Sequence, residues 1–145
     1  MAATTAPIFT QVPKISWVQV SGVDGGTDGT DADVQLVFTA DATDGSYLQK
    51  LVLQPRSTSG STTTSAAAAR VYINNGSTVG TASNNVLYRE ATLPATSVNV
   101  AGTTGALAVE IPLNIQLPAG YRVYVGITAI AANTQWAVTG VGGDY

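Results

Sequence analysis

The chain has 145 residues, the length of one domain, and a compact fold of that size buries roughly 70% of the surface that its unfolded chain exposes. It contains no cysteine and no histidine, which excludes disulfides and thiolate metal sites and removes the commonest general base and metal ligand. Six Lys and Arg against nine Asp and Glu cannot form the basic surface that nucleic acid requires, so we expect no nucleic-acid partner. We also expect no cofactor.

The chain also lacks the marks of export and of membrane insertion. Residues 1–10 have neither a basic start nor an apolar run, and no stretch reaches the ~18 consecutive apolar residues of a membrane span. We therefore expect a protein that is made and stays soluble in a cytoplasm, with no membrane partner. Charged residues are only 10% of the chain, whereas a free cytosolic monomer normally relies on interspersed charge for solubility. We infer that other subunits cover much of this surface.

The first segment, Met1 to Pro13, is rich in Ala and Thr and has no turn chemistry that would fold it back on itself. It carries two large apolar side chains, Ile8 and Phe9. Such a segment is either a frayed terminus or an extended arm that places both side chains on a neighbouring subunit, in one version as an added strand. The expectation of an oligomer slightly favours the arm. We therefore divide the chain into an arm, residues 1–13, and a domain, residues 14–145.

The rest of the chain alternates between apolar and polar residues over short segments, which Gly, Pro, Asn and Asp separate. This pattern predicts eight strands, at residues 14–20, 34–39, 47–54, 70–74, 85–92, 107–117, 121–127 and 135–141. Pro55 is expected to end the third strand, because proline cannot donate to a ladder. The Ser, Thr and Ala tract of residues 57–69 is expected to be a mobile loop that runs into the fourth strand.

The clearest strand is Leu107 to Leu117, where every second residue is apolar. Pro118-Ala119-Gly120 interrupts this alternation and Tyr121 to Ile127 resumes it, which predicts two paired strands joined by a tight turn. A hairpin with one apolar face needs a second apolar layer to cover it. Since no segment has a helical period, we predict an all-β fold: a single-domain β-sandwich of about eight strands, with jelly-roll or related Greek-key topology.

Four aspartates lie close together in the loop of residues 21–33: Asp24, Asp28, Asp31 and Asp33. Clustered carboxylates are typical of calcium sites, but this spacing does not fit the EF-hand pattern. Asp and Gly are also common turn residues, so we favour an ordinary turn-rich loop over a calcium site.

Few residues remain that could catalyse a reaction. Glu90 and Glu110 are the only glutamates, and a glycosidase would need two carboxylates held ~5 to 10 Å apart across a sugar cleft. We interpret both as solvated side chains on strands. Lys14 and Lys50 are isolated, with no Gly-rich phosphate loop beside them. We therefore predict that the protein is not an enzyme and has no catalytic, cofactor-binding or metal-binding residues.

A binding surface is suggested by the tripeptide Arg-Val-Tyr, which occurs at residues 70–72 and 122–124. In a strand, the period of two points each Arg and Tyr outward and each Val into the core, and Arg and Tyr are enriched at interface hot spots. An ordinary surface, on which each Arg stacks on a Tyr or pairs with an acid, is the equally weighted alternative. The candidate interface comprises Ile8, Phe9, Arg70, Tyr72, Arg122 and Tyr124.

The two tryptophans, Trp17 and Trp136, offer a second kind of binding surface. An exposed tryptophan can stack on a sugar ring, as in lectin-like jelly rolls. Burial in the sandwich core is the commoner arrangement, and we favour it over the sugar platform.

Several short motifs spread along the chain carry a family resemblance. They are Ala2-Ala3-Thr4-Thr5-Ala6-Pro7, Asp28-Gly29-Thr30, Val37-Phe38-Thr39-Ala40, Leu117-Pro118-Ala119-Gly120-Tyr121 and Gly142-Gly143-Asp144-Tyr145. Together they make the chain resemble small structural proteins from the virion modules of tailed bacteriophages and prophages. The resemblance implies a β-sandwich virion protein without catalytic residues.

Within a virion, the composition fits a capsid decoration or cement protein. Such a protein would be made in the bacterial host cytoplasm, bind the major capsid protein on the capsid surface, form a homotrimer and bridge neighbouring capsomers. It would stabilise the expanded shell by mass action. Two alternatives stay open: a structural protein of the phage tail or fibre base, and a carbohydrate-binding module for host attachment.

Overall fold

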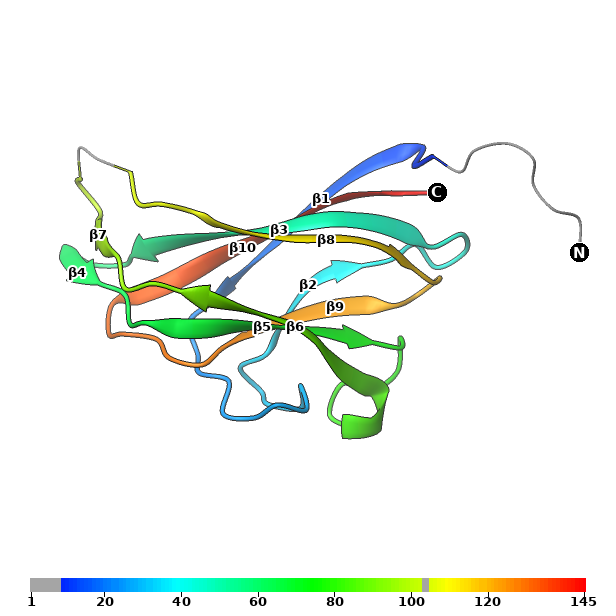
Figure 1. Ribbon diagram of the computed structural model, residues 1–145, viewed down its shortest axis with the longest axis horizontal. Coiled ribbons are helices and arrows are strands. Elements are labelled where there is room, and N and C mark those ends of the chain that lie inside the picture. The colour runs from blue at the N-terminus through cyan, green and yellow to red at the C-terminus, as the bar shows by residue number, and fades with distance from the viewer. Residues whose placement is uncertain (1–8, 103–104) are drawn as a thin grey trace, which may run out of the picture.

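The computed structural model describes residues 9–102 and 105–145. These residues form strands joined by loops, with one 3₁₀ turn, η1 (Ala82–Asn84), and no α-helix (Figure 1). The strands are β1 (Val12–Val20), β2 (Gln35–Thr39), β3 (Ser46–Ser57), β4 (Ser61–Thr63), β5 (Ala67–Asn74), β6 (Asn85–Leu93), β7 (Ser97–Asn99), β8 (Val109–Leu117), β9 (Arg122–Ile127) and β10 (Thr134–Asp144). Within this described part of the chain, no helix has the length and apolar character needed to cross a membrane.

Eight of the strands form two four-stranded sheets, and β4 and β7 form a separate ribbon, at the opposite end of the molecule from the C-terminus (Figure 1). The first sheet has the order β1-β10-β3-β8 and the second the order β2-β9-β5-β6. Four antiparallel pairs, β1·β10, β2·β9, β3·β8 and β5·β6, nest inside one another along the chain. The pairs β10·β3 and β9·β5 roll this nest into two layers, which is a jelly roll. The predicted all-β sandwich is confirmed.

The core lies between the two sheets and is filled by inward side chains from both. Its largest fully buried side chains include Trp136, Phe38, Leu48 and Leu51. Burying one side chain of this size contributes about 1.5–3 kcal/mol relative to leaving it in water. Gln49 is an extra, unpaired residue of β3, and this bulge resets the alternation so that Leu48 and Leu51 both face inward.

The predicted strands are present, but several of their ends differ. β1 begins at Val12, so Val12 and Pro13 belong to the sandwich although we assigned them to the arm. The prediction that Pro55 ends the third strand is wrong, because β3 continues to Ser57 and Pro55 pairs with Trp136. The partner on the other side of β3 begins only at Val109, opposite Leu53, so Pro55 lies where one side of β3 has no strand partner.

Two short strands occur where the sequence predicts loops. β4 lies in the tract of residues 57–69, which we expected to be a mobile loop, and β7 lies in the polar connection before β8. The two strands pair with each other in antiparallel register over three residues each. Both are too short and too polar to show an alternating pattern, so their pairing could not be read from the sequence.

The predicted hairpin of residues 107–117 and 121–127 is wrong. β8 pairs with β3 in the first sheet, whereas β9 pairs with β2 and β5 in the second. The turn between them, where the Tyr121 amide donates to the Pro118 carbonyl at 3.1 Å, carries the chain from one layer to the other. Alternation identifies which face of a strand is buried, but it does not identify the strand that lies beside it. The apolar faces of β8 and β9 are both buried here in the core between the two sheets.

Candidate functional site

The outer face of the first sheet has an apolar half on β1 and β10. Ile15 and Trp17 of β1 point away from the core and are 62% and 73% exposed. Their partners across the ladder are Val141 and Thr139 of β10, which are partly exposed. We call these four residues the β1 patch. Exposed aromatic and branched side chains on one face are more typical of a contact surface than of a solvated one.

The other half of this face, on β3 and β8, is polar. The Lys50 ammonium lies 2.9 Å from a Glu110 carboxylate oxygen, and the Tyr47 hydroxyl donates to the Asn114 side chain at 2.8 Å. An exposed ion pair of this kind contributes about 0–1 kcal/mol. The pair therefore contributes little to the stability of the sheet. It shows where the apolar half of this face ends.

A groove lies at the end of the sandwich where β1 begins. It consists of two hollows of about 650 and 270 Å³ that share Gln116 and Tyr145. Phe9 lines the smaller hollow and is 73% exposed, so the chain enters β1 with a second large apolar side chain in solvent. We call this the terminal groove. β1 begins beside this groove, and the β1 patch lies further along the same strand.

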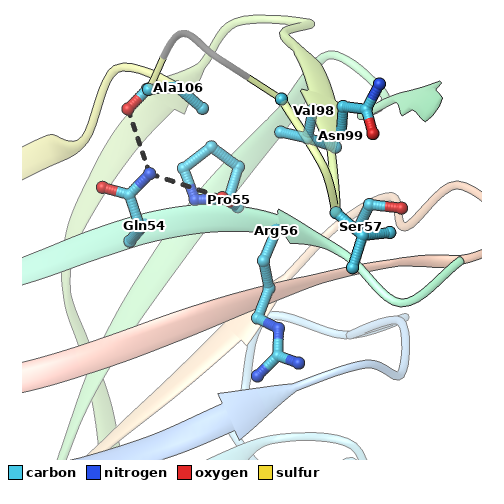
Figure 2. A pocket seen from close by; sticks show the side chains of 10 residues that line it. Gln54, Pro55, Arg56, Ser57, Val98, Asn99 and Ala106 are labelled. Atoms are coloured by element: carbon cyan, nitrogen blue, oxygen red, sulfur yellow. Dashed lines mark hydrogen bonds between the residues drawn. The ribbon is translucent and has the colours of Figure 1, made fainter. Parts of the chain in front are cut away.

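A third hollow, of about 420 Å³, lies between the end of β3 and β7 (Figure 2). The Gln54 amide spans its mouth by donating to the Ala106 carbonyl at 3.0 Å, and Figure 2 shows the Arg56 side chain pointing away from Ala106 and Asn99. Among the described residues that line it, Arg56 is the only ionisable one. The hollow therefore offers no pair of groups for acid-base chemistry.

The loop of residues 21–34 covers part of the outer face of the second sheet. The Asp24 carboxylate is fully buried under it and accepts hydrogen bonds from the Tyr72 hydroxyl at 2.7 Å and the Gly26 amide at 3.0 Å. An Arg70 guanidinium nitrogen lies 3.7 Å from the same carboxylate and donates to the Gly26 carbonyl. We call the Asp24, Gly26, Arg70 and Tyr72 contacts the loop clamp. They attach the loop to β5.

Two ionisable groups of the loop clamp, on Tyr72 and Arg70, have raised pKa values. Burial raises the pKa of the Tyr72 hydroxyl well above its usual range, and the hydrogen bond to Asp24 adds to this shift. The hydrogen bond from Arg70 to Glu90, at 3.0 Å, raises the pKa of the Arg70 guanidinium. Tyr72 therefore stays protonated and donates to Asp24 over the whole ordinary pH range. This is the chemistry of a structural contact, since the clamp leaves no free acid or base.

Four of the predicted interface residues, Arg70, Tyr72, Arg122 and Tyr124, share the outer face of the second sheet, but they do not form an exposed surface. Tyr72 and Tyr124 point out of the sheet as the period predicts, but they are only 1% and 8% exposed because the protein's own chain covers them. The expectation that these tyrosines are exposed is therefore wrong. Arg122 is partly exposed and donates to the Ser77 carbonyl at 3.4 Å. Phe9 is exposed, and Ile8 lies outside the described residues.

The two tryptophans have opposite environments. Trp136 is 1% exposed, as favoured, and its indole nitrogen has no hydrogen-bond partner among the described residues. Trp17 is exposed, against expectation, because β1 buries the other face, with Ser16 and Val18. Ser16 faces inward since its hydroxyl donates to the Val37 carbonyl of β2 at 2.6 Å. Alternation alone suggests that the polar residues of β1 face solvent. Here a polar residue faces inward instead, because it forms a hydrogen bond to the backbone of the neighbouring strand.

The remaining candidate residues lie apart. Glu90 pairs with Arg70 on the outer face of the second sheet, and Glu110 pairs with Lys50 on the outer face of the first. These faces point in opposite directions, so the two glutamates cannot act together across one cleft. The loop aspartates bind their own backbone two residues on, with Asp28 accepting from Thr30 and Asp31 from Asp33, as turn residues do. Among the described residues, no three acidic side chains lie close enough to hold a metal ion.

Comparison of the chain with protein-family models, with curated proteins and with solved structures gave no match.

The β1 patch and the terminal groove are therefore the candidate functional site. Sequence reasoning did not identify Ile15 and Trp17 as exposed residues, since it favoured burial of Trp17 and gave Ile15 no role. The signal that could have found them lies further along the strand, where Val18 and Val20 are apolar on the opposite face and Gln19 is polar on the face of Trp17. The Lys14 ammonium faces inward because it donates to the Thr39 carbonyl of β2 at 2.7 Å and lies 3.1 Å from an Asp144 carboxylate oxygen.

Proposed function

We propose that the protein is a non-enzymatic structural subunit of a tailed-phage virion, a decoration protein that binds the outside of the shell formed by the major capsid protein and bridges capsomers. The observation that carries this proposal is the β1 patch, in which Trp17 and Ile15 remain exposed on a surface with little charge. Aromatic side chains in such a position are typical anchors of protein interfaces. The jelly-roll topology supports it by analogy, because viral capsid domains use this fold.

The test is a titration of labelled protein onto purified expanded shells of its own phage. We expect saturation at a fixed number of copies per lattice site. Trp17→Ala should weaken binding at least ~10-fold, because it removes a hot-spot side chain. Tyr88→Ala is the matched control, since Tyr88 is an exposed aromatic residue on β6 in the other sheet. Absence of wild-type binding to shells would contradict the proposal and favour the tail or fibre base.

The arm is tested by deleting residues 1–8. This truncation keeps Gln11, whose amide donates to the Asp144 carbonyl at 2.8 Å, and all of β1. We expect the truncated protein to unfold at the same denaturant concentration as the full chain and to bind shells more weakly. Equal binding by the two proteins would show that residues 1–8 of the arm are not a contact.

A carbohydrate-binding module for host attachment is the second candidate, and the exposure of Trp17 favours it specifically. A sugar ring that stacks on Trp17 should change the tryptophan fluorescence in a saturable way. Trp136 is buried and supplies a constant signal, so Trp17→Phe should abolish the change. No response across a broad glycan panel would contradict this candidate.

A further inference from the structure

In the described part of the chain, the sandwich has four edge strands, and three of them are irregular or covered. β8 contains Pro112 and Asn114, whose φ is +51°, and its register with β3 shifts there. β6 carries a register shift at Tyr88. β2 has five residues, also with a shift, and β1 side chains cap its outward carbonyls. Such features prevent the addition of another strand to an edge.

β1 is the exception. Its ladder with β10 runs over nine residues with no register shift. Among the described residues, the backbone of β1 bonds only to β10, so on its other side alternate amides and carbonyls have no strand partner. Beside this open edge lie the exposed side chains of Ile15 and Trp17. A long, regular and apolar edge is a template for strand addition.

We propose that β1 pairs with β1 of a second copy, in antiparallel register about a two-fold axis. Such an axis, perpendicular to the sheet, keeps the outer face outside, so only residues of the same face can stand opposite each other. Centring the pair on Ser16 places Ile15 opposite Trp17 of the second copy, in both directions. A large aromatic residue opposite a β-branched one is a favourable cross-strand pair.

The charge of β1 also suits a copy of itself. Lys14 is the only charged residue of the strand, and in this register it stands opposite Val18 of the second copy rather than another lysine. Its ammonium is held inward by Asp144 and by the Thr39 carbonyl, and it lies 5.2 Å from the centre of the Phe38 ring. No like charges therefore meet when two β1 strands pair.

This inference deepens the proposed function and rests on the same surface, because pairing joins the two β1 patches into one continuous apolar face on an eight-stranded sheet. The larger face would then be the surface that meets the shell. The two-fold dimer replaces the expected homotrimer. The interface is short, so we expect a reversible dimer whose population depends on concentration.

The experiment is sedimentation equilibrium of the full chain over a concentration series. We expect the mass to rise from that of the 14.8 kDa chain to twice that value. Trp17→Lys and Ile15→Lys should each raise the dimer dissociation constant at least ~30-fold, as for loss of an interface hot spot. Val86→Lys, at an exposed apolar site on β6, should leave the constant unchanged. Urea midpoints equal to that of the wild type, measured at a concentration where all proteins are monomers, establish that each variant is folded.

A second measurement tests the register. The chain contains no cysteine, so Ile15→Cys and Trp17→Cys can be introduced separately without background. Oxidation of a mixture should give the disulfide between the two different variants in preference to either homodimer.

Several outcomes would overturn the inference. They are a monomer at every concentration, a trimer mass, a dimer that survives both lysine variants, or a dimer lost on deletion of residues 1–8, which would indicate exchange of that segment. The shell titration is independent. A dimer that does not bind shells supports the pairing of β1 strands and contradicts the decoration function. Shell binding by a protein that is a monomer at every concentration contradicts only the pairing.

Discussion

The two outer faces of the sandwich are built from similar strands but differ in the exposure of their aromatic side chains to solvent. On the first sheet, Trp17 projects from β1 and stays in solvent. On the second sheet, Tyr72 and Tyr124 project in the same way and are buried by the chain itself. The difference lies in the segments that cover the second sheet, which are the loop of residues 21–34 and Val79 in the connection between β5 and β6, and not in the strands. The period of a strand thus tells which side a residue occupies, while coverage of that side depends on segments elsewhere in the chain.

Two local features let this loop lie against the second sheet. The Asp24 amide donates to the Ile127 carbonyl at 2.9 Å, which fixes the start of the loop at the end of β9. Gly126 provides the space, since a Cβ atom there would lie 2.4 Å from an Asp24 carboxylate oxygen. A glycine inside a predicted strand is a sign of close backbone approach. Gly126 was thus the sequence signal for a covered face.

The largest expected effect separates the two tryptophans. Trp136→Ala should lower the free energy of unfolding by about 3–5 kcal/mol, because it leaves a cavity in the core. Trp17→Ala should change it by less than about 0.5 kcal/mol, as an exposed surface substitution. Urea titrations followed by circular dichroism measure both values. A comparable loss in both variants, at a concentration where the protein is a monomer, would mean that the first face is also covered within the monomer.

The next effect concerns the loop clamp. Asp24→Ala should lower the free energy of unfolding by about 3 kcal/mol, because it leaves the Tyr72 hydroxyl and the Arg70 guanidinium without their buried partner. The same urea titration measures it. Asp44→Ala is the control, since Asp44 is an exposed loop residue. If the two variants were equally stable, the loop would not depend on the clamp.

A smaller effect is expected from Tyr72→Phe, which removes one hydrogen bond and should lower the free energy of unfolding by about 1 kcal/mol. The pH dependence has a definite sign. The pKa of Tyr72 is raised in the folded state, so its contribution is complete below the unfolded pKa of about 10 and is lost as the pH rises above it. Stability measured from pH 8 to 11 should therefore fall less steeply in Tyr72→Phe than in wild type. A parallel decline would contradict the prediction.

The smallest effect lies on the acidic side. The hydrogen bond from the Thr30 amide lowers the pKa of the Asp28 carboxyl in the covering loop. Its contribution is therefore present at neutral pH and is lost as the pH falls through the folded-state pKa. Asp28→Asn should therefore make stability slightly less dependent on acid than it is in the wild type. Urea titrations between pH 2 and 6 test the difference.

Much of the fold could be predicted, because alternation in segments such as residues 107–117 is a direct consequence of burying one face of a strand. The neighbours of each strand could not. The alternation in β8 and β9 is compatible both with a hairpin and with strands in two different sheets. Only the packing of all strands distinguishes these arrangements. The candidate site was harder still. Ile15 and Trp17 have the composition of a buried face and are exposed because Ser16 and Lys14 bond to β2.

The nesting of the strands also governs the order in which the molecule can form during synthesis. β10 lies between β1 and β3, so β1 has no backbone partner until residues 134–144 have left the ribosome. The contacts that complete the first sheet join residues more than a hundred positions apart, which predicts a high contact order and folding in milliseconds to seconds. Until then β1 exposes both of its edges, and association of nascent chains through this strand is the expected failure of folding.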